Sequence, residues 1–156
     1  MIKSCFRYNL VVQRSFIFLL FATISFSHFG CGEEDNFPER QFIGYFDLTN
    51  PLYSQNTVFT ARRDSYGTYL GINGIVVYKL GSDYYAFDLM CPYEQSETCS
   101  VVVDPEDPSF AVCECCGSRF LLSSPYGDLV EGPAPYGLRR YSTSVSQNIL
   151  VVTSSY

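Results

Sequence analysis

Cysteines are the residues of this chain whose type and spacing could support chemistry. Of seven in 156 residues, five fall into two short clusters. The first holds Cys91 and, eight positions later, Cys99, and the second holds Cys113, Cys115 and Cys116. Thiolates bind zinc and iron–sulfur clusters, and the Cys-x-x-Cys spacing of Cys113 and Cys116 is typical of such sites. We therefore expect a metal site whose ligands are Cys91, Cys99, Cys113 and Cys116.

Each cysteine cluster comes at the end of an apolar run, in a chain made of short apolar runs separated by turn residues. Loops at strand ends can aim ligands in directions that strands cannot. No segment of ten or more residues carries a helical period beyond the first 30 residues. Short strands at this spacing predict an all-β sandwich or barrel, with hairpins at 74–80/84–89 and 100–103/110–113. The runs expected to be strands are residues 42–48, 57–61, 74–80, 84–89, 100–103, 110–113, 120–122, 129–130, 141–145 and 149–153.

Three motifs occur in the order of the cluster-binding motifs of the Rieske iron–sulfur family. Residues 91–93 (Cys-Pro-Tyr) resemble the first ligand loop, Cys-Pro-His, and residues 113–118 (Cys-Glu-Cys-Cys-Gly-Ser) resemble the second, Cys-Pro-x-His-Gly-Ser. Residues 132–135 (Gly-Pro-Ala-Pro) are similar to the proline loop that covers the cluster. The resemblance implies a Rieske-like antiparallel β sandwich over 42–156, with a small cysteine-loop subdomain. It also implies supporting roles at the site for Tyr93, Ser118 and Pro133.

Two departures from the family pattern decide which chemistry remains. Tyr93 and Cys116 stand where the two ligand histidines should be, and the only histidine of the chain is His28. A Rieske centre needs two imidazoles on one iron, so this chain cannot form one. Tyr93 is a poor substitute ligand, because a phenol stays protonated near neutral pH. The cofactor expected is therefore a [2Fe–2S] cluster or zinc held by four thiolates.

A metal-free alternative stays open. Some Rieske proteins carry a disulfide between their two loops, and the resemblance implies such a bond between Cys99 and Cys115, with Cys91 then pairing with Cys113 or Cys116. Such a chain would be a disulfide-stapled scaffold that acts as a surface binding module, with one free thiol. A redox-active Cys113/Cys116 dithiol is disfavoured, because thioredoxin-like motifs open a helix and this one leads into an expected strand.

The first 30 residues have the layout of a secretory signal peptide. Lys3, Arg7 and Arg14 precede an apolar run at 16–26, which is shorter than the about 20 residues that cross a bilayer. Gly30-Cys31 resembles a lipobox, which predicts lipidation of Cys31, with plain secretion as the alternative. Residues 31–41 are expected to be an acidic flexible tether like those of Bacteroidetes-type lipoproteins. The predicted location is outside the cytoplasm, in the periplasm or at the cell surface, with a lipid anchor in the membrane.

Charge and composition exclude two classes of function. The net charge of −6 becomes −9 without the three basic residues of the first 30, and binding to a phosphate backbone relies on basic side chains. We therefore expect no nucleic-acid partner. With no histidine beyond residue 30, neither a Ser-His-Asp nor a Cys-His arrangement can form, and we expect no enzyme. The function expected is an exported metal or iron–sulfur protein, with electron transfer to a protein partner if the metal is iron.

Overall fold

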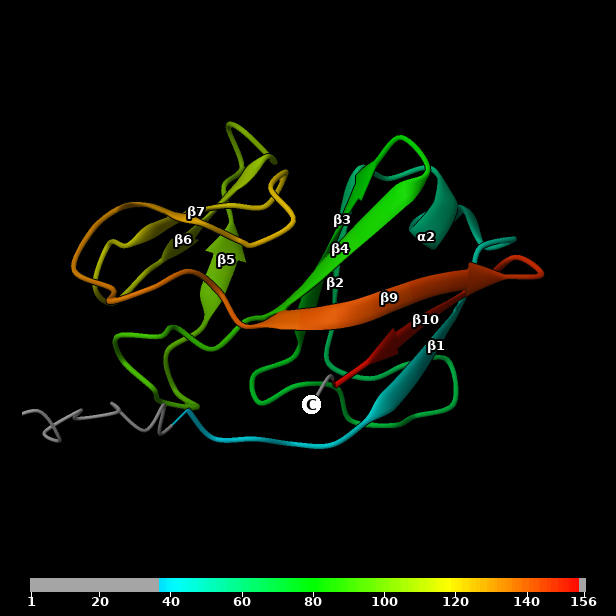
Figure 1. Ribbon diagram of the computed structural model, residues 1–156, viewed down its shortest axis with the longest axis horizontal. Helices are drawn as coiled ribbons and strands as arrows, with labels where there is room; N and C mark the ends of the chain where they lie inside the picture. The colour runs from blue at the N-terminus through cyan, green and yellow to red at the C-terminus, as the bar shows by residue number, and fades with distance from the viewer. Residues whose placement is uncertain (1–36, 155–156) are drawn as a thin grey trace, which may run out of the picture. The chain divides into compact units, whose positions relative to one another are not determined.

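The computed structural model describes residues 37–154, and its regular secondary structure consists almost entirely of antiparallel strands (Figure 1). The predictions for residues 1–30, for Cys31 and for tether residues 31–36 lie outside the described residues. The elements are β1 (Ile43–Asp47), α2 (Pro51–Ser54), β2 (Val58–Ala61), β3 (Ile75–Leu80), β4 (Asp83–Asp88), β5 (Val101–Val103), β6 (Phe110–Cys113), β7 (Arg119–Leu121), β8 (Leu129–Glu131), β9 (Arg140–Ser146) and β10 (Ile149–Thr153). The all-β prediction is confirmed.

The larger sheet has six strands in the order β1-β10-β9-β4-β3-β2. All adjacent strands of this sheet are antiparallel. Strand β9 joins the C-terminal hairpin to β4 through the pairs Ala86↔Tyr141 and Phe87↔Arg140. Gln147 and Asn148 turn between β9 and β10 with φ angles of 50° and 63°, the left-handed conformation that tight hairpins require. The sheet thus brings the two ends of the domain side by side.

The smaller sheet is a meander of four short strands in the order β5-β6-β7-β8 (Figure 1). The β5/β6 hairpin pairs Val101 with Cys113, and β6 pairs with β7 through Val112 and Arg119. The two cysteine loops come just before β5 and between β6 and β7. This sheet and its loops therefore form the cysteine subdomain.

Strands β3 and β4 lie between two hydrophobic cores because alternate side chains of a strand point to opposite faces. Val76, Tyr78 and Phe87 join the core that contains the cysteines and the small sheet. Ile75, Val77 and Ala86 join the other, which includes Phe42 and Phe46. The hairpin β3/β4 is consequently shared by both halves of the domain.

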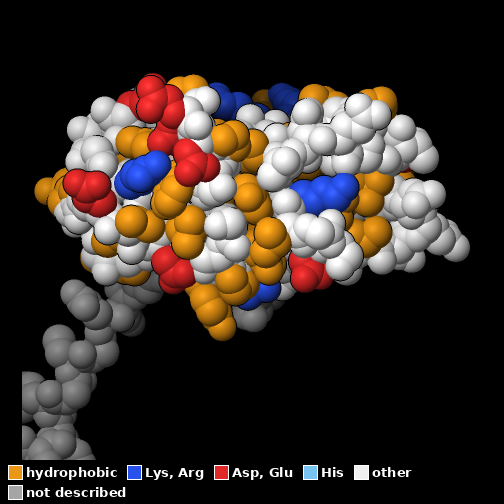
Figure 2. All heavy atoms as spheres, turned by 90° about the horizontal axis from the view of Figure 1, so that it is seen from above, with side chains coloured by type: hydrophobic (Ala, Val, Ile, Leu, Met, Phe, Trp, Pro, Cys, Tyr) orange, Lys and Arg blue, Asp and Glu red, His pale blue; other side chains and the backbone are white. Residues whose placement is uncertain are grey.

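Acidic side chains concentrate on the half with the small sheet. Residues 89–138 contain eight Asp or Glu and one Arg, whereas the other described residues contain five acidic and six basic side chains. Figure 2 shows the acidic side chains gathered over the half of the molecule that carries the small sheet. The surroundings of the cysteine loops are therefore strongly negative.

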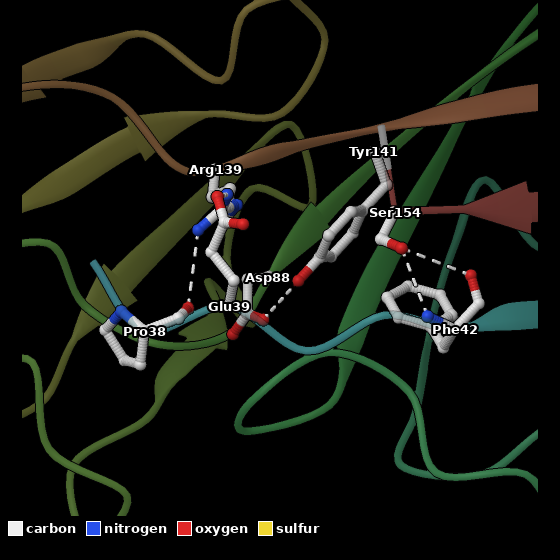
Figure 3. A network of polar contacts seen from close by, with 7 residues as sticks. All are labelled: Pro38, Glu39, Phe42, Asp88, Arg139, Tyr141 and Ser154. Atoms are coloured by element: carbon white, nitrogen blue, oxygen red, sulfur yellow. Dashed lines mark hydrogen bonds and ion pairs between the residues drawn. The ribbon is translucent and has the colours of Figure 1, made fainter. Parts of the chain in front are cut away.

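The start of the described chain packs against the domain. Phe37 and Phe42 are buried, and Arg139 pairs with Glu39 and donates to the carbonyl oxygen of Pro38 (Figure 3). Residues 37–41 were expected to belong to the flexible tether, but apolar burial attaches them to the domain. No helix of residues 37–154 is long and apolar enough to cross a membrane.

Candidate metal centre

The first cysteine loop is closed at its base by backbone hydrogen bonds. Met90 bridges to Ser100, and the Val101 N–H donates to the Leu89 carbonyl at 2.7 Å. Within the loop, the N–H of Gln95 donates to the Cys91 carbonyl at 2.9 Å. This turn folds the backbone back over Cys91, whose side chain is fully buried.

Asp88 and Asn73 hold this loop in place from the side. The buried Asp88 carboxylate accepts from the N–H groups of Ile72 and Met90, each at 2.6 Å. It also accepts from the Tyr141 hydroxyl at 2.6 Å (Figure 3). The Asn73 Nδ2 donates to the carbonyls of Ser96 and Cys99. The roles of Asp88 and Asn73 were not predicted from the sequence, although Asp88 is a charged residue that ends an apolar strand next to a cysteine loop.

Burial has a further effect on the Tyr141 side chain. Loss of hydration and the adjacent Asp88 carboxylate both raise the pKa of Tyr141 well above its usual value. The phenol therefore stays protonated and serves as a hydrogen-bond donor to Asp88.

The second cysteine loop is a tight turn between β6 and β7. The Cys113 N–H donates to the Ser118 carbonyl and the Gly117 N–H to the Cys113 carbonyl, both at 2.8 Å. Gly117 has φ of 73°, a conformation that residues other than glycine rarely adopt. The turn directs Cys113 and Cys116 towards the first loop.

A disulfide joins the two loops. Cys99, which is buried, is bonded to Cys115, which is exposed, across 16 positions of sequence. A sulfur in a disulfide offers no thiolate to a metal. The expected ligand set of four is thereby reduced, because Cys99 belongs to the disulfide and only Cys91, Cys113 and Cys116 have free thiols among the described residues.

The three free thiols converge on one point. The sulfur atoms of Cys91, Cys113 and Cys116 all lie within 4.8 Å of one another, and the Cys91 and Cys116 sulfurs are 3.6 Å apart. Two thiolates bound to one tetrahedral zinc at 2.3 Å lie about 3.8 Å apart. Cys91 and Cys113 are fully buried, and Cys116 is half-buried. The spacing fits one metal ion, with its fourth position open.

The local surroundings move the pKa values of two of these thiols in opposite directions. Burial raises the pKa of Cys91 to about 12, against the opposing hydrogen bonds from the N–H groups of Glu94 and Tyr93. At Cys116, burial acts in the same upward direction, but hydrogen bonds with the Ser118 side chain and backbone, together with the nearby thiols, outweigh it and lower the pKa. In the absence of a metal, Cys116 is therefore the more acidic of the two.

Ser118 connects the second loop to the proline loop. Its Oγ lies 3.1 Å from the Cys116 sulfur and accepts the N–H of Ala134 at 3.0 Å. Gly132 passes so close that a Cβ there would lie 2.4 Å from the Ser118 Cα, so only glycine fits. Ala134 is buried in the cysteine core, whereas Pro133 is exposed. The proline loop thus packs against the site through Ala134 rather than through Pro133.

Tyr93 does not fill the site. Its side chain is 54% exposed, and its contribution to Cys91 is the backbone N–H. A supporting role inside the site, or ligation by the phenolate, would require the Tyr93 ring to point inward. Tyr93 therefore adds no fourth ligand in this structure, and a [2Fe–2S] cluster with four protein ligands does not fit the three thiols that are free.

The sequence was compared with known proteins. No family model and no curated protein matches the chain.

Proposed function

We propose that this chain is an exported, lipid-anchored protein of Rieske-like architecture that binds a metal ion through Cys91, Cys113 and Cys116. The observation that carries the proposal is the convergence of three thiol sulfurs within 4.8 Å of one another, two of them fully buried. Buried thiols that meet from two separate loops match the way structural metal sites are assembled. A bound zinc would supply a crosslink between the loops, and a redox-active metal would add one-electron chemistry.

The hydrogen bonds around the sulfurs support ligation by thiolates. The backbone N–H groups of Glu94 and Tyr93 point at Cys91, and the backbone N–H of Ser118 points at Cys116. Donors aimed at sulfur stabilise the charged thiolate and tune a metal bound to it. The acidic surface of residues 89–138 adds a negative potential that attracts cations.

Export is supported by two independent features. The N-terminal 30 residues have the pattern of a signal peptide, and Cys99 and Cys115 form a disulfide. Disulfides persist in oxidising compartments and are rare in the cytosol. Fractionation of cells that express the full chain, with Cys31→Ser as the comparison, tests the anchor. Release of the variant alone from the membrane fraction supports lipidation, and an equal distribution of both proteins contradicts it.

A second candidate is the metal-free, disulfide-stapled binding module. The 3.6 Å between the Cys91 and Cys116 sulfurs favours it, because a small movement would bring them to bonding distance. Cys113 would then be the single free thiol of residues 37–154. In that case the function would reside in the surface and not in the cysteines.

Metal content and thiol count separate the two candidates. A soluble chain beginning at Glu33 would be produced in reducing and in oxidising compartments and measured by elemental analysis and thiol titration. One equivalent of metal that is lost in Cys113→Ser, but retained in the matched Cys99→Ser/Cys115→Ser variant, supports the metal site. No metal in either preparation, with one free thiol and two disulfides, contradicts it and favours the binding module.

A further inference from the structure

The basic side chains of residues 37–154 differ in whether they have partners. Arg63, Lys79, Arg119 and Arg139 each form a side-chain hydrogen bond or ion pair. Within residues 37–154, the structure shows no side-chain hydrogen bond or ion pair for Arg40, Arg62 or Arg140. Two of these three, Arg40 and Arg62, line the same cavity.

This cavity has a volume of about 220 Å³ and is formed by three segments that lie far apart in the sequence. Arg40 comes from the segment before β1, Tyr69 and Ile72 from the loop between β2 and β3, and Glu97 from the first cysteine loop. Pockets for drug-sized ligands typically exceed about 300 Å³, so this one suits a smaller molecule.

Charge and shape define the chemistry of the occupant. Two arginines, Arg40 and Arg62, and one acidic residue, Glu97, line the cavity, so its lining residues carry a net positive charge on an otherwise acidic protein. Guanidinium groups bind carboxylates and phosphates through paired hydrogen bonds. Tyr69 also lines the cavity, and the Arg63 guanidinium stacks 3.6 Å from the centroid of its ring.

We propose that this cavity binds a small organic anion, with a carboxylate or phosphate group held by Arg40 and Arg62 and an apolar body against Tyr69 and Ile72. The proposal does not depend on metal binding by the cysteines. The cavity is nevertheless linked to them, because Asn73 also lines it and donates its Nδ2 to the Cys99 carbonyl. An occupant therefore contacts the residue that holds the first cysteine loop.

Titration of the full-length chain with four probes tests the proposal. Benzoate and phenyl phosphate carry an apolar body, whereas acetate and inorganic phosphate carry the anionic group alone. We expect saturable binding of benzoate or phenyl phosphate, followed by NMR or calorimetry at low ionic strength, and weaker binding of the matching small ion. The tighter of the two aromatic probes identifies the anionic group.

Variants locate the binding. Arg40→Gln and Arg62→Gln should each weaken binding about tenfold or more, as expected for loss of a charged hydrogen bond. Glu97→Gln should strengthen it, because it removes the negative charge from the cavity wall. Arg140→Gln is the matched control, since Arg140 also lacks a partner in the described chain but lies outside the cavity, and it should bind like the unchanged protein. Absence of saturable binding by all four probes, or equal weakening by Arg140→Gln, would overturn the proposal.

Discussion

The two halves of the domain are stabilised in different ways. The large-sheet half has an aromatic core in which ring pairs such as Phe42/Tyr141 and Phe46/Phe59 pack edge to face, with centroids 4.8 and 5.3 Å apart. The small-sheet half has strands of three or four residues, and three cysteines belong to its core. A small region buries too little apolar surface to be stable by packing alone, and a crosslink compensates for this.

The halves also differ in electrostatics. The cysteine half, residues 89–138, carries a net charge of −7, whereas the remaining described residues carry +1. The three arginines whose side chains form no hydrogen bond or ion pair within residues 37–154 lie in the large-sheet half, and the free thiols of those residues lie in the acidic half. The difference teaches that the proposed cation site lies in the acidic half, whereas the proposed anion site lies where the two halves meet, because Glu97 of the first cysteine loop also lines that cavity.

The sharpest way to test the division is to truncate one buried phenylalanine in each half. Phe46 and Phe120 are both fully buried, and Phe→Ala should lower the free energy of unfolding by about 3–5 kcal/mol at either position. Phe120→Ala should also weaken metal binding, because Phe120 belongs to the core that holds the cysteines, whereas Phe46→Ala should not. Denaturant unfolding and metal titration measure the two effects. An equal loss of metal affinity in Phe46→Ala and Phe120→Ala would contradict the division into two separately stabilised halves.

Removal of the disulfide between Cys99 and Cys115 should destabilise the small-sheet half and leave the large-sheet half nearly unchanged. Replacement of Cys99 and Cys115 by serine opens a 16-residue connection, which is expected to cost about 3 kcal/mol. Hydrogen exchange should become faster in β5–β8 and stay nearly unchanged in β1, β9 and β10. Uniformly faster exchange across both sheets would show that the halves unfold as one unit.

Metal affinity should rise with pH. Burial raises the pKa of Cys91 to about 12, so at neutral pH a metal must displace the proton from this thiol. Each displaced proton changes the apparent affinity by about tenfold per pH unit, and the affinity falls as the pH is lowered. Competition with a chelator of known protonation between pH 6 and 8 measures the slope. A flat profile would argue against Cys91 as a ligand.

The smallest change in metal affinity is expected for substitution of Tyr93. Its ring is 54% exposed, so Tyr93→Phe should change metal affinity by no more than about twofold, as is usual for surface substitutions. The same titration used for the buried phenylalanines measures it. A large loss of affinity would mean that the phenol turns inward and completes the ligand set.

Much of the fold could be predicted because its signals are local. Apolar runs separated by turn residues predicted strands over 110–113 and 149–153 as the structure has them, and within a few residues for the other eight. The one-turn helix α2 was not predicted, although Asn50 caps it and Pro51 begins it. A helix of four residues is too short to show a periodic pattern.

The sequence by itself determined that the domain is all-β, that two loops carry five cysteines, and that no Rieske centre can form, since residue types and turn signals suffice for each. Tertiary structure decided which sulfurs meet. Cys99 and Cys115 were candidates for a bond, but their distance depends on the β5/β6 register and on the Asp88 and Asn73 contacts that fold the first loop back. The cavity with Arg40 and Arg62 likewise exists only where three distant segments pack together, and pairing over such separations leaves no local pattern in the sequence.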